Sequence, residues 1–304
     1  MSSALVALLI VLVGILFASQ APINSGLGRS TGPLAAAFVS FGVGMVALFL
    51  IILIGGTIGG LGSIGEVPAW QFTGGLIGAT YVALATITIS RIGAGVVAAT
   101  TITGQLACSV AVDHYGWFGI EVHDVTGPRV LGLLLLLGGA LAMLYSREEA
   151  SSSAPVSDRR QRAVFVALIF FSAALVGLQH PINSELATRV GDFPAGFVNF
   201  AVGTLLLGLL VLATGKALGL KRIGDPRFYY YFGGLIGVVV VVSSLAAVTE
   251  IGAASLTSAL VTGQLIGSLV LDRFGAFGLK QIPVNGIRLA AAVALLAGTF
   301  LATG

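Results

Sequence analysis

Charged residues are scarce in this chain. Only 9% of its 304 residues are Asp, Glu, Lys or Arg, whereas a soluble domain carries roughly 25%. A surface that faces water needs such residues, so most of this chain cannot be exposed to water. The net charge is only +3, and the basic residues lie in loops without interleaved aromatic residues. This pattern argues against a nucleic-acid partner.

Cysteine and the signatures of soluble enzymes are also nearly absent. Cys108 is the single cysteine, which excludes an intrachain disulfide and is typical of a buried, inert thiol. The chain has no HExxH motif, no P-loop, and no GxGxxG in a strand–turn–helix setting. Segment 113–128 contains two His and three acidic residues, but no metal-ligand spacing, and is interpreted as a solvated loop. We therefore expect neither an enzyme nor a bound cofactor or metal.

Long apolar runs are what the chain has in place of charge. A membrane-spanning helix needs about 20 mostly apolar residues. Ten segments meet this requirement, which predicts an all-α membrane protein. The first has no positive residue before it, so we interpret it as a span and not as a signal peptide. The predicted spans are 4–21, 34–55, 70–90, 93–112, 128–146, 163–180, 194–214, 229–249, 252–271 and 287–303.

The second half of the chain repeats the first at a spacing of 159 residues. Gln20-Ala-Pro-Ile-Asn24 recurs as Gln179-His-Pro-Ile-Asn183, and 13 of the 25 positions 20–44 are identical to their partners. We therefore divide the chain into a first five-helix repeat, a polar cytoplasmic linker and a second five-helix repeat. An odd number of spans places two consecutive copies in opposite orientations, as in many transporters. The predicted boundaries are 1–146, 147–162 and 163–304.

The distribution of basic residues predicts the orientation in the membrane. Thirteen Lys and Arg residues fall in one set of alternate loops, and only Arg129 and Arg189 fall in the other. Basic loops stay in the cytoplasm. We therefore expect a multi-pass protein of the cell (inner) membrane with both termini outside the cytoplasm.

Polar residues inside the predicted spans are the candidates for a binding site, because each must find a partner where water is absent. Gln105 and Gln264 lie near the centres of spans 4 and 9. Thr103 and Thr262 stand just before them, within about one helical turn. Central polar groups at a repeat interface favour contact with a substrate. The alternative is that these side chains bond helix to helix and only hold the bundle together.

The repeated Gln-x-Pro-Ile-Asn element is predicted to end spans 1 and 6. Proline removes a backbone donor and kinks or stops a helix. Freed carbonyls, together with the amides of Gln20, Asn24, Gln179 and Asn183, would then line a cavity. A helix stop with capping side chains explains the element equally well.

Further candidates are an amide, three aromatic residues and two ionisable groups. Asn199 would add an amide to the site, and its neighbour Phe200, with Phe41 and Tyr81, would add aromatic walls, although packing accounts for any single ring. His180 and Glu250 are the best candidates for proton coupling, but interfacial placement is the favoured interpretation of both. The sequence places no charge clearly at the midplane, which favours a neutral, weakly charged or aromatic-boxed ligand. It also leaves an uncoupled facilitator open.

Four short motifs occur in both halves of the chain: Gln-x-Pro-Ile-Asn, Phe-Val-[Ser/Asn]-Phe, Gly-Gly-Leu-Ile-Gly and Thr-Gly-Gln. In these motifs the chain resembles the YdcZ-like family of the drug/metabolite transporter superfamily, in its fused two-repeat form. The resemblance implies that helices 1–4 and 6–9 surround a central cavity and that helices 5 and 10 lie peripherally. It also implies that Gln105, Gln264, Asn24 and Asn183 face the cavity. The best-known superfamily members have cytoplasmic termini, whereas the charge bias of this chain predicts the reverse.

The sequence thus predicts a secondary carrier for a small organic metabolite or drug-like compound, working by alternating access. Besides this small-molecule substrate, the expected partners are membrane lipids and, in a possible homodimer, a second copy of the chain. A lipid flippase is the alternative in mechanism and would need a basic headgroup pocket. A non-transporting membrane partner would need large loops or a soluble domain. A membrane enzyme would need a catalytic dyad within the spans.

Overall fold

The computed structural model describes residues 2–92, 94–122, 124, 126–149, 159–215, 227–278 and 281–303. This part of the chain is mostly helical and contains no strand. Short 3-10 helices connect the longer ones at Thr57–Glu66 (η1), Ala69–Phe72 (η2), Trp117–Gly119 (η3), Phe228–Tyr231 (η5) and Ala276–Gly278 (η6). The α-helices are α1 Ser3–Phe17, α2 Gln20–Thr31, α3 Pro33–Ile54, α4 Thr73–Ile92, α5 Ala94–Tyr115, α6 Gly127–Glu149, α7 Arg159–Val190, α8 Asp192–Ala213, α9 Phe232–Phe274 and α10 Gly286–Thr303.

Helices α3 and α8 begin in the same way. Gly32 precedes α3 with φ +86°, and Gly191 precedes α8 with φ +90°. Only glycine adopts such a conformation without strain. Pro33 then occupies the first turn of α3, where its missing N–H costs no helical hydrogen bond. The sharp entry into both helices is thus specified by the local sequence.

The prediction that the Gln-x-Pro-Ile-Asn elements end two spans is wrong for the second copy, whereas α1 does end three residues before the first copy, at Phe17. Pro181 lies inside the continuous helix α7, and Pro22 lies in the first turns of α2, after a break between α1 and α2 at Ala18 and Ser19. A proline ring collides with the carbonyl four residues earlier, and packing against neighbouring helices makes that disturbance tolerable in a membrane protein. Helix α7 packs against α4, α5, α8 and α9, so it continues through the proline.

The predicted spans 8 and 9 form one continuous element, α9, with a kink. Gly252 has φ +78° and ψ 166° and separates its two helical parts. The amides that follow, of Ala253 and Ala254, donate to the carboxylate of Asp113 at 2.7 and 3.1 Å. The break is therefore capped from α5, because the first amides of a helix have no partner within it.

The linker predicted at 147–162 overlaps the ends of two helices. Helix α6 continues to Glu149, and α7 already begins at Arg159. Residues 150–158 lie outside the described part of the chain.

Five helical stretches of the described residues are long and apolar enough to cross a membrane. Two shorter apolar helices lie at Gly127–Met143 and Gly286–Ala302. Large apolar side chains such as Leu8, Phe171 and Leu205 are exposed on the outside of the bundle, as lipid contact requires. The chain is therefore a multi-pass helical membrane protein. The five stretches are Ser3–Thr31, Pro33–Ile54, Arg160–Val190, Asp192–Ala213 and Phe228–Phe274.

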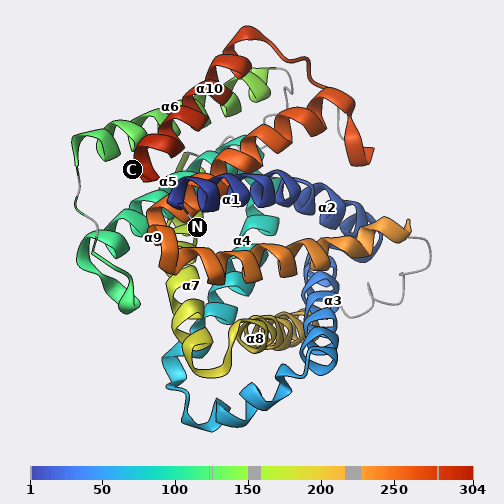
Figure 1. Ribbon diagram of the computed structural model, residues 1–304. Helices are drawn as coiled ribbons and strands as arrows, with labels where there is room; N and C mark the ends of the chain where they lie inside the picture. The colour runs from blue at the N-terminus through green and yellow to red at the C-terminus, as the bar shows by residue number, and fades with distance from the viewer. Residues whose placement is uncertain are drawn as a thin grey trace.

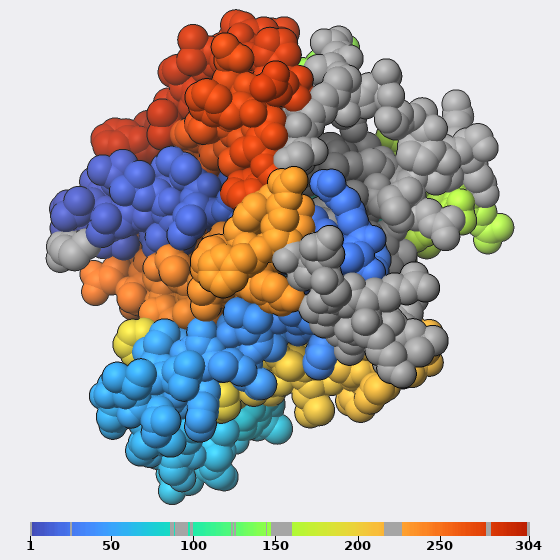
Figure 2. Space-filling view, turned by 90° about the vertical axis from the view of Figure 1, so that its right-hand side faces the viewer, coloured from blue at the N-terminus to red at the C-terminus, as the bar shows by residue number. Residues whose placement is uncertain are grey.

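The closest helix pairs each join the two halves of the chain. Helix α1 lies along α9, α5 packs against α7, α3 against α8, and α6 against α10 (Figure 1). Figure 2 shows this packing of the two halves on one face of the molecule. The dark blue N-terminal part of the chain lies between the red C-terminal part and the orange first part of α9. Neither half forms a bundle by itself, so the core is shared between them.

Local geometry also recurs at the spacing of 159 residues. Phe118 and Phe277 are the two non-glycine residues with positive φ in the described chain, at 59° and 56°. The Arg288 guanidinium donates to the Asp272 carboxylate at 2.6 Å, and Arg129 donates to Asp113 in the same way. The two halves therefore share details that go beyond helix order.

Candidate substrate cavity

A hollow of about 180 Å³ lies at the centre of the bundle, between the two halves. Residues from α1 to α5 and from α7 to α9 line it, whereas α6 and α10 contribute none of its described lining. Its volume is below the roughly 300–1,000 Å³ of drug-sized sites. Seven carboxamides stand in the described lining: Gln20, Asn24, Gln105, Gln179, Asn183, Asn199 and Gln264.

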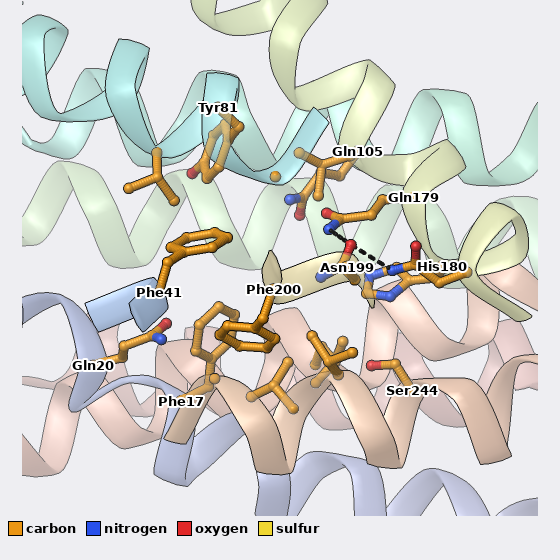
Figure 3. Close-up of a pocket in the computed structure, with 18 of the residues that line it drawn as sticks. Phe17, Gln20, Phe41, Tyr81, Gln105, Gln179, His180, Asn199, Phe200 and Ser244 are labelled. Carbon is orange, nitrogen blue, oxygen red and sulfur yellow. Dashed lines mark hydrogen bonds between the residues drawn. The ribbon is translucent and has the colours of Figure 1, made fainter. Parts of the chain in front are cut away.

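Three of these amides form a network on the side of the second half. The Oδ1 atom of Asn199 accepts a hydrogen bond from Gln179 Nε2 at 3.2 Å and another from Asn183 Nδ2 at 3.1 Å (Figure 3). In this orientation of the three amides, the oxygen of Asn199 accepts both bonds. The NH₂ group of Asn199 then remains as a donor, and among the described residues it has no partner.

The first half places the corresponding amides differently. Gln20 Nε2 donates to the backbone carbonyl of Gly233 at 2.8 Å, and Asn24 lies against the same glycine. Position 40, which corresponds to Asn199, is a serine and offers no amide oxygen. The shorter side chain explains why Gln20 bonds to the backbone whereas Gln179 bonds to a neighbouring amide.

Gln105 and Gln264 both line the cavity beside close helix crossings. Cβ atoms added at Gly14 and Gly177 would lie 3.1 Å from the backbone nitrogen of Gln264 and 3.0 Å from the carbonyl of Gln105. These glycines let α1 approach α9, and α7 approach α5. Among the described residues, neither glutamine side chain has a hydrogen-bond partner. The alternative that these amides hold the bundle together is therefore not supported.

Aromatic side chains form the other part of the lining. The rings of Phe41 and Phe200 lie 5.3 Å apart at 44°, with Phe17 on the same side of the hollow (Figure 3). The Tyr81 hydroxyl and the Thr101 hydroxyl are within hydrogen-bond distance at 3.3 Å. Phe41 also packs against Gly203, and Phe200 against Gly44, so the two rings are held by reciprocal contacts.

The two ionisable candidates lie in different places. His180 lines the cavity next to the amide network, whereas Glu250 is exposed and lies outside the lining. The interfacial placement favoured for both residues stays a prediction. The described lining contains no Asp, Glu, Lys or Arg.

The two candidate threonines also lie outside the lining. Thr262 is buried between α9 and α10, where its hydroxyl pairs with that of Thr299 at 2.6 Å. This pairing gives Thr262 the helix-packing role that was the alternative for it. Thr103 is half-buried and is not among the lining residues.

Sequence reasoning missed several features of the site. Phe17, Thr101 and Ser244 line the cavity, although nothing in their local sequence marks them. The buried Asp–Arg pairs were also missed, although their recurrence at the spacing of 159 was a signal that could have revealed them. Asp113, which was assigned to a solvated loop, is fully buried in one of these pairs. His123, from the same loop, lies outside the described residues.

A helical bundle with apolar outer faces and a central hollow lined by amides and aromatic rings defines a multi-pass membrane protein with a candidate site for a small molecule. The family model described as "Putative inner membrane exporter, YdcZ" matches residues 5–142 and again 164–301. The chain belongs to this family and is a protein of the inner membrane.

Two further proteins are similar to this chain. The chain is 29% identical to "Inner membrane protein YdcZ" of Escherichia coli (strain K12) over 140 residues, which are 44% of this chain and 92% of that protein. The relative therefore corresponds to about one half of this chain. A crystal structure of a protein superimposes with a TM-score of 0.70 at 15% identity, covering 98% of this chain and 96% of that one. This likeness concerns the fold alone.

Proposed function

We propose that the chain is a ten-span secondary transporter that exports a small organic compound by alternating access through the central cavity. One observation carries the proposal: the two halves contribute equivalent amides to one hollow, as Gln20 with Gln179, Asn24 with Asn183 and Gln105 with Gln264. Transporters built from repeats bind their substrates at such an interface. The outward direction is taken from the description of the family.

The reciprocal contacts support an inverted arrangement of the repeats. Helix α1 packs on the second part of α9 as its counterpart α7 packs on α5, and the family model matches each half of the chain separately. Five spans in each unit would turn the second upside down in the membrane. The basic loops would then lie in the cytoplasm and both termini outside it.

The orientation is testable by labelling single cysteines. The chain provides one background thiol, Cys108, which is replaced by alanine. Glu66→Cys and Arg227→Cys lie at the ends of η1 and before η5, in loops that belong to opposite sides of the proposed arrangement. A membrane-impermeant maleimide added to intact cells is expected to label position 66 and not position 227. Labelling of both positions from one side would refute the inverted repeat.

The transport site is testable with purified protein in liposomes. We expect a thermal-shift screen against metabolite and drug libraries to yield ligands that also cross the membrane in counterflow. The double variant Gln105→Ala plus Gln264→Ala is expected to abolish both signals. Ser268→Ala is the matched control, because this serine lies one turn beyond Gln264 and bonds only to the Leu265 carbonyl of its own helix. Transport that survives the double change would contradict the assignment of the cavity.

The flippase alternative has no comparable support. A basic headgroup pocket was its requirement, and the described lining contains neither Lys nor Arg.

A further inference from the structure

The cavity has two chemically different ends. Gln105, Gln179, His180, Asn199 and Ser244 lie toward one end of the hollow, and the rings of Phe17, Phe41 and Phe200 lie toward the other (Figure 3). Gln20 lies at the aromatic end, where its amide nitrogen already donates to the Gly233 carbonyl. A ligand that fits both ends must itself have a polar part and an apolar, ring-like part, because aromatic rings pack best against other flat apolar surfaces.

The two repeats carry different residues at several equivalent positions of the cavity lining. His180 corresponds to Ala21, and Asn199 corresponds to Ser40. Tyr81 and Thr101 correspond to Val240 and Leu260, which line the facing wall from α9. At these four pairs the more polar residue lies on α4, α5, α7 or α8, which pack against one another. These four differences therefore add polar groups to the wall formed by α4, α5, α7 and α8, while Gln20, Ser244 and Gln264 remain as polar groups on the facing helices.

The wall formed by α4, α5, α7 and α8 presents hydrogen-bond donors and acceptors to the cavity, and its described lining residues include no Asp, Glu, Lys or Arg. The NH₂ group of Asn199 is an unused donor, and Gln105 presents both an amide oxygen and an amide nitrogen that no described residue bonds. No Asp, Glu, Lys or Arg in the described lining can balance an ionic ligand. An ion buried without a partner is strongly disfavoured, whereas a carboxamide both donates and accepts.

The volume limits the size of the ligand. A hollow of about 180 Å³ is well below the range for drug-sized compounds, so it accommodates one ring with one substituent.

We propose, on the basis of the proposed function, that the substrate is an uncharged single-ring compound with a carboxamide-like edge. Its donor–acceptor edge meets Asn199, Gln105 and His180, and its ring packs against the pair of contacting rings formed by Phe41 and Phe200. The class includes aromatic carboxamides and lactam heterocycles.

Three probes of the same shape test this assignment. Nicotinamide carries a neutral amide, nicotinate a carboxylate, and 3-(aminomethyl)pyridine an ammonium group at pH 7.5. Calorimetric titration of the purified full-length protein is expected to show at least tenfold tighter binding of nicotinamide than of either ion. Equal or tighter binding of an ion, or no binding of nicotinamide, would overturn the assignment.

Asn199→Asp provides a second, independent test. The new carboxylate retains acceptors for Gln179 and Asn183 and therefore preserves the network, but it replaces the unused donor with a negative charge. We expect nicotinamide to bind at least tenfold more weakly to the variant and the ammonium probe to bind best. Ser268→Ala, outside the cavity, is expected to keep the original order. An unchanged order in Asn199→Asp would place the head group elsewhere and refute the proposal.

The outcomes separate this proposal from the transport function. If library compounds cross liposomes in a manner that depends on Gln105 and Gln264, but the amide probe does not bind, only the substrate class is wrong. If neither the library nor the probes give any movement across the membrane, the transport function itself is refuted.

Discussion

The two partners of the buried Asp113–Arg129 ion pair are predicted to be unequal in their contribution to stability. Asp113 accepts hydrogen bonds from Arg129 and from the amides of Ala253 and Ala254, and its exposure is 0%. Arg129 has this one carboxylate as its described ionic partner. The carboxylate therefore holds both the α5–α6 connection and the second part of α9.

The magnitudes follow from these contacts. Asp113→Asn leaves the buried Arg129 charge without a counter-ion, which costs about 3–5 kcal/mol of unfolding free energy. Arg129→Leu leaves a carboxylate that still accepts two amide hydrogen bonds, each stabilising by about 1.5–3 kcal/mol. We therefore expect Arg129→Leu to cost about 2 kcal/mol less than Asp113→Asn.

The assay is equilibrium unfolding in mixed micelles at increasing mole fraction of sodium dodecyl sulfate, followed by circular dichroism. The double variant serves as the internal control, because it contains no unpaired charge and is expected to be more stable than Asp113→Asn alone. Equal costs for the two single variants, or strictly additive costs in the double variant, would refute the role of Asp113 as the cap of α9.

Three further predictions concern the kink, the threonine pair and the aromatic contacts. Gly252→Ala is expected to lower the unfolding free energy by about 2 kcal/mol in the same assay, because its backbone has φ +78° and an added Cβ would lie 2.9 Å from Asp113 Oδ2. Thr262→Val is expected to cost about 1 kcal/mol through its lost hydrogen bond while ligand binding, measured by calorimetry, stays unchanged. Gly203→Ala is expected to displace the Phe41 ring and to weaken ligand binding about tenfold with little change in helix content, since an added Cβ would lie 2.5 Å from that ring.

Much of the helical arrangement was predictable because apolar length and the repeat are strong signals. The span expected at 34–55 corresponds to Pro33–Ile54, and the one at 194–214 to Asp192–Ala213. The errors lie where tertiary contacts override local signals. Pro181 does not end α7, because neighbouring helices support the helix on both sides of it. Whether all ten segments cross the membrane remains a prediction.

The candidate site was predictable only in part. Repetition directed attention to Gln105 and Gln264, and both line the cavity. Thr262 has the same repeated context, yet it points to α10, because residues two positions apart on a helix face different directions. Phe17 and Ser244 carry no motif, and only the approach of α1 to α9 brings them to the hollow. Such residues are defined by packing and not by their local sequence.

Ala21 differs from its counterpart His180, and Ser40 differs from Asn199. These differences make the two ends of the cavity chemically unequal. Two identical copies of one half would enclose a cavity with twofold symmetry. An asymmetric ligand would then bind in two equivalent orientations. Joining both halves in one polypeptide allows each to mutate alone, so a single pose can be preferred. The ligand would then cross the membrane in one orientation relative to the protein. An enantiomer or a ring isomer of the ligand would contact different side chains.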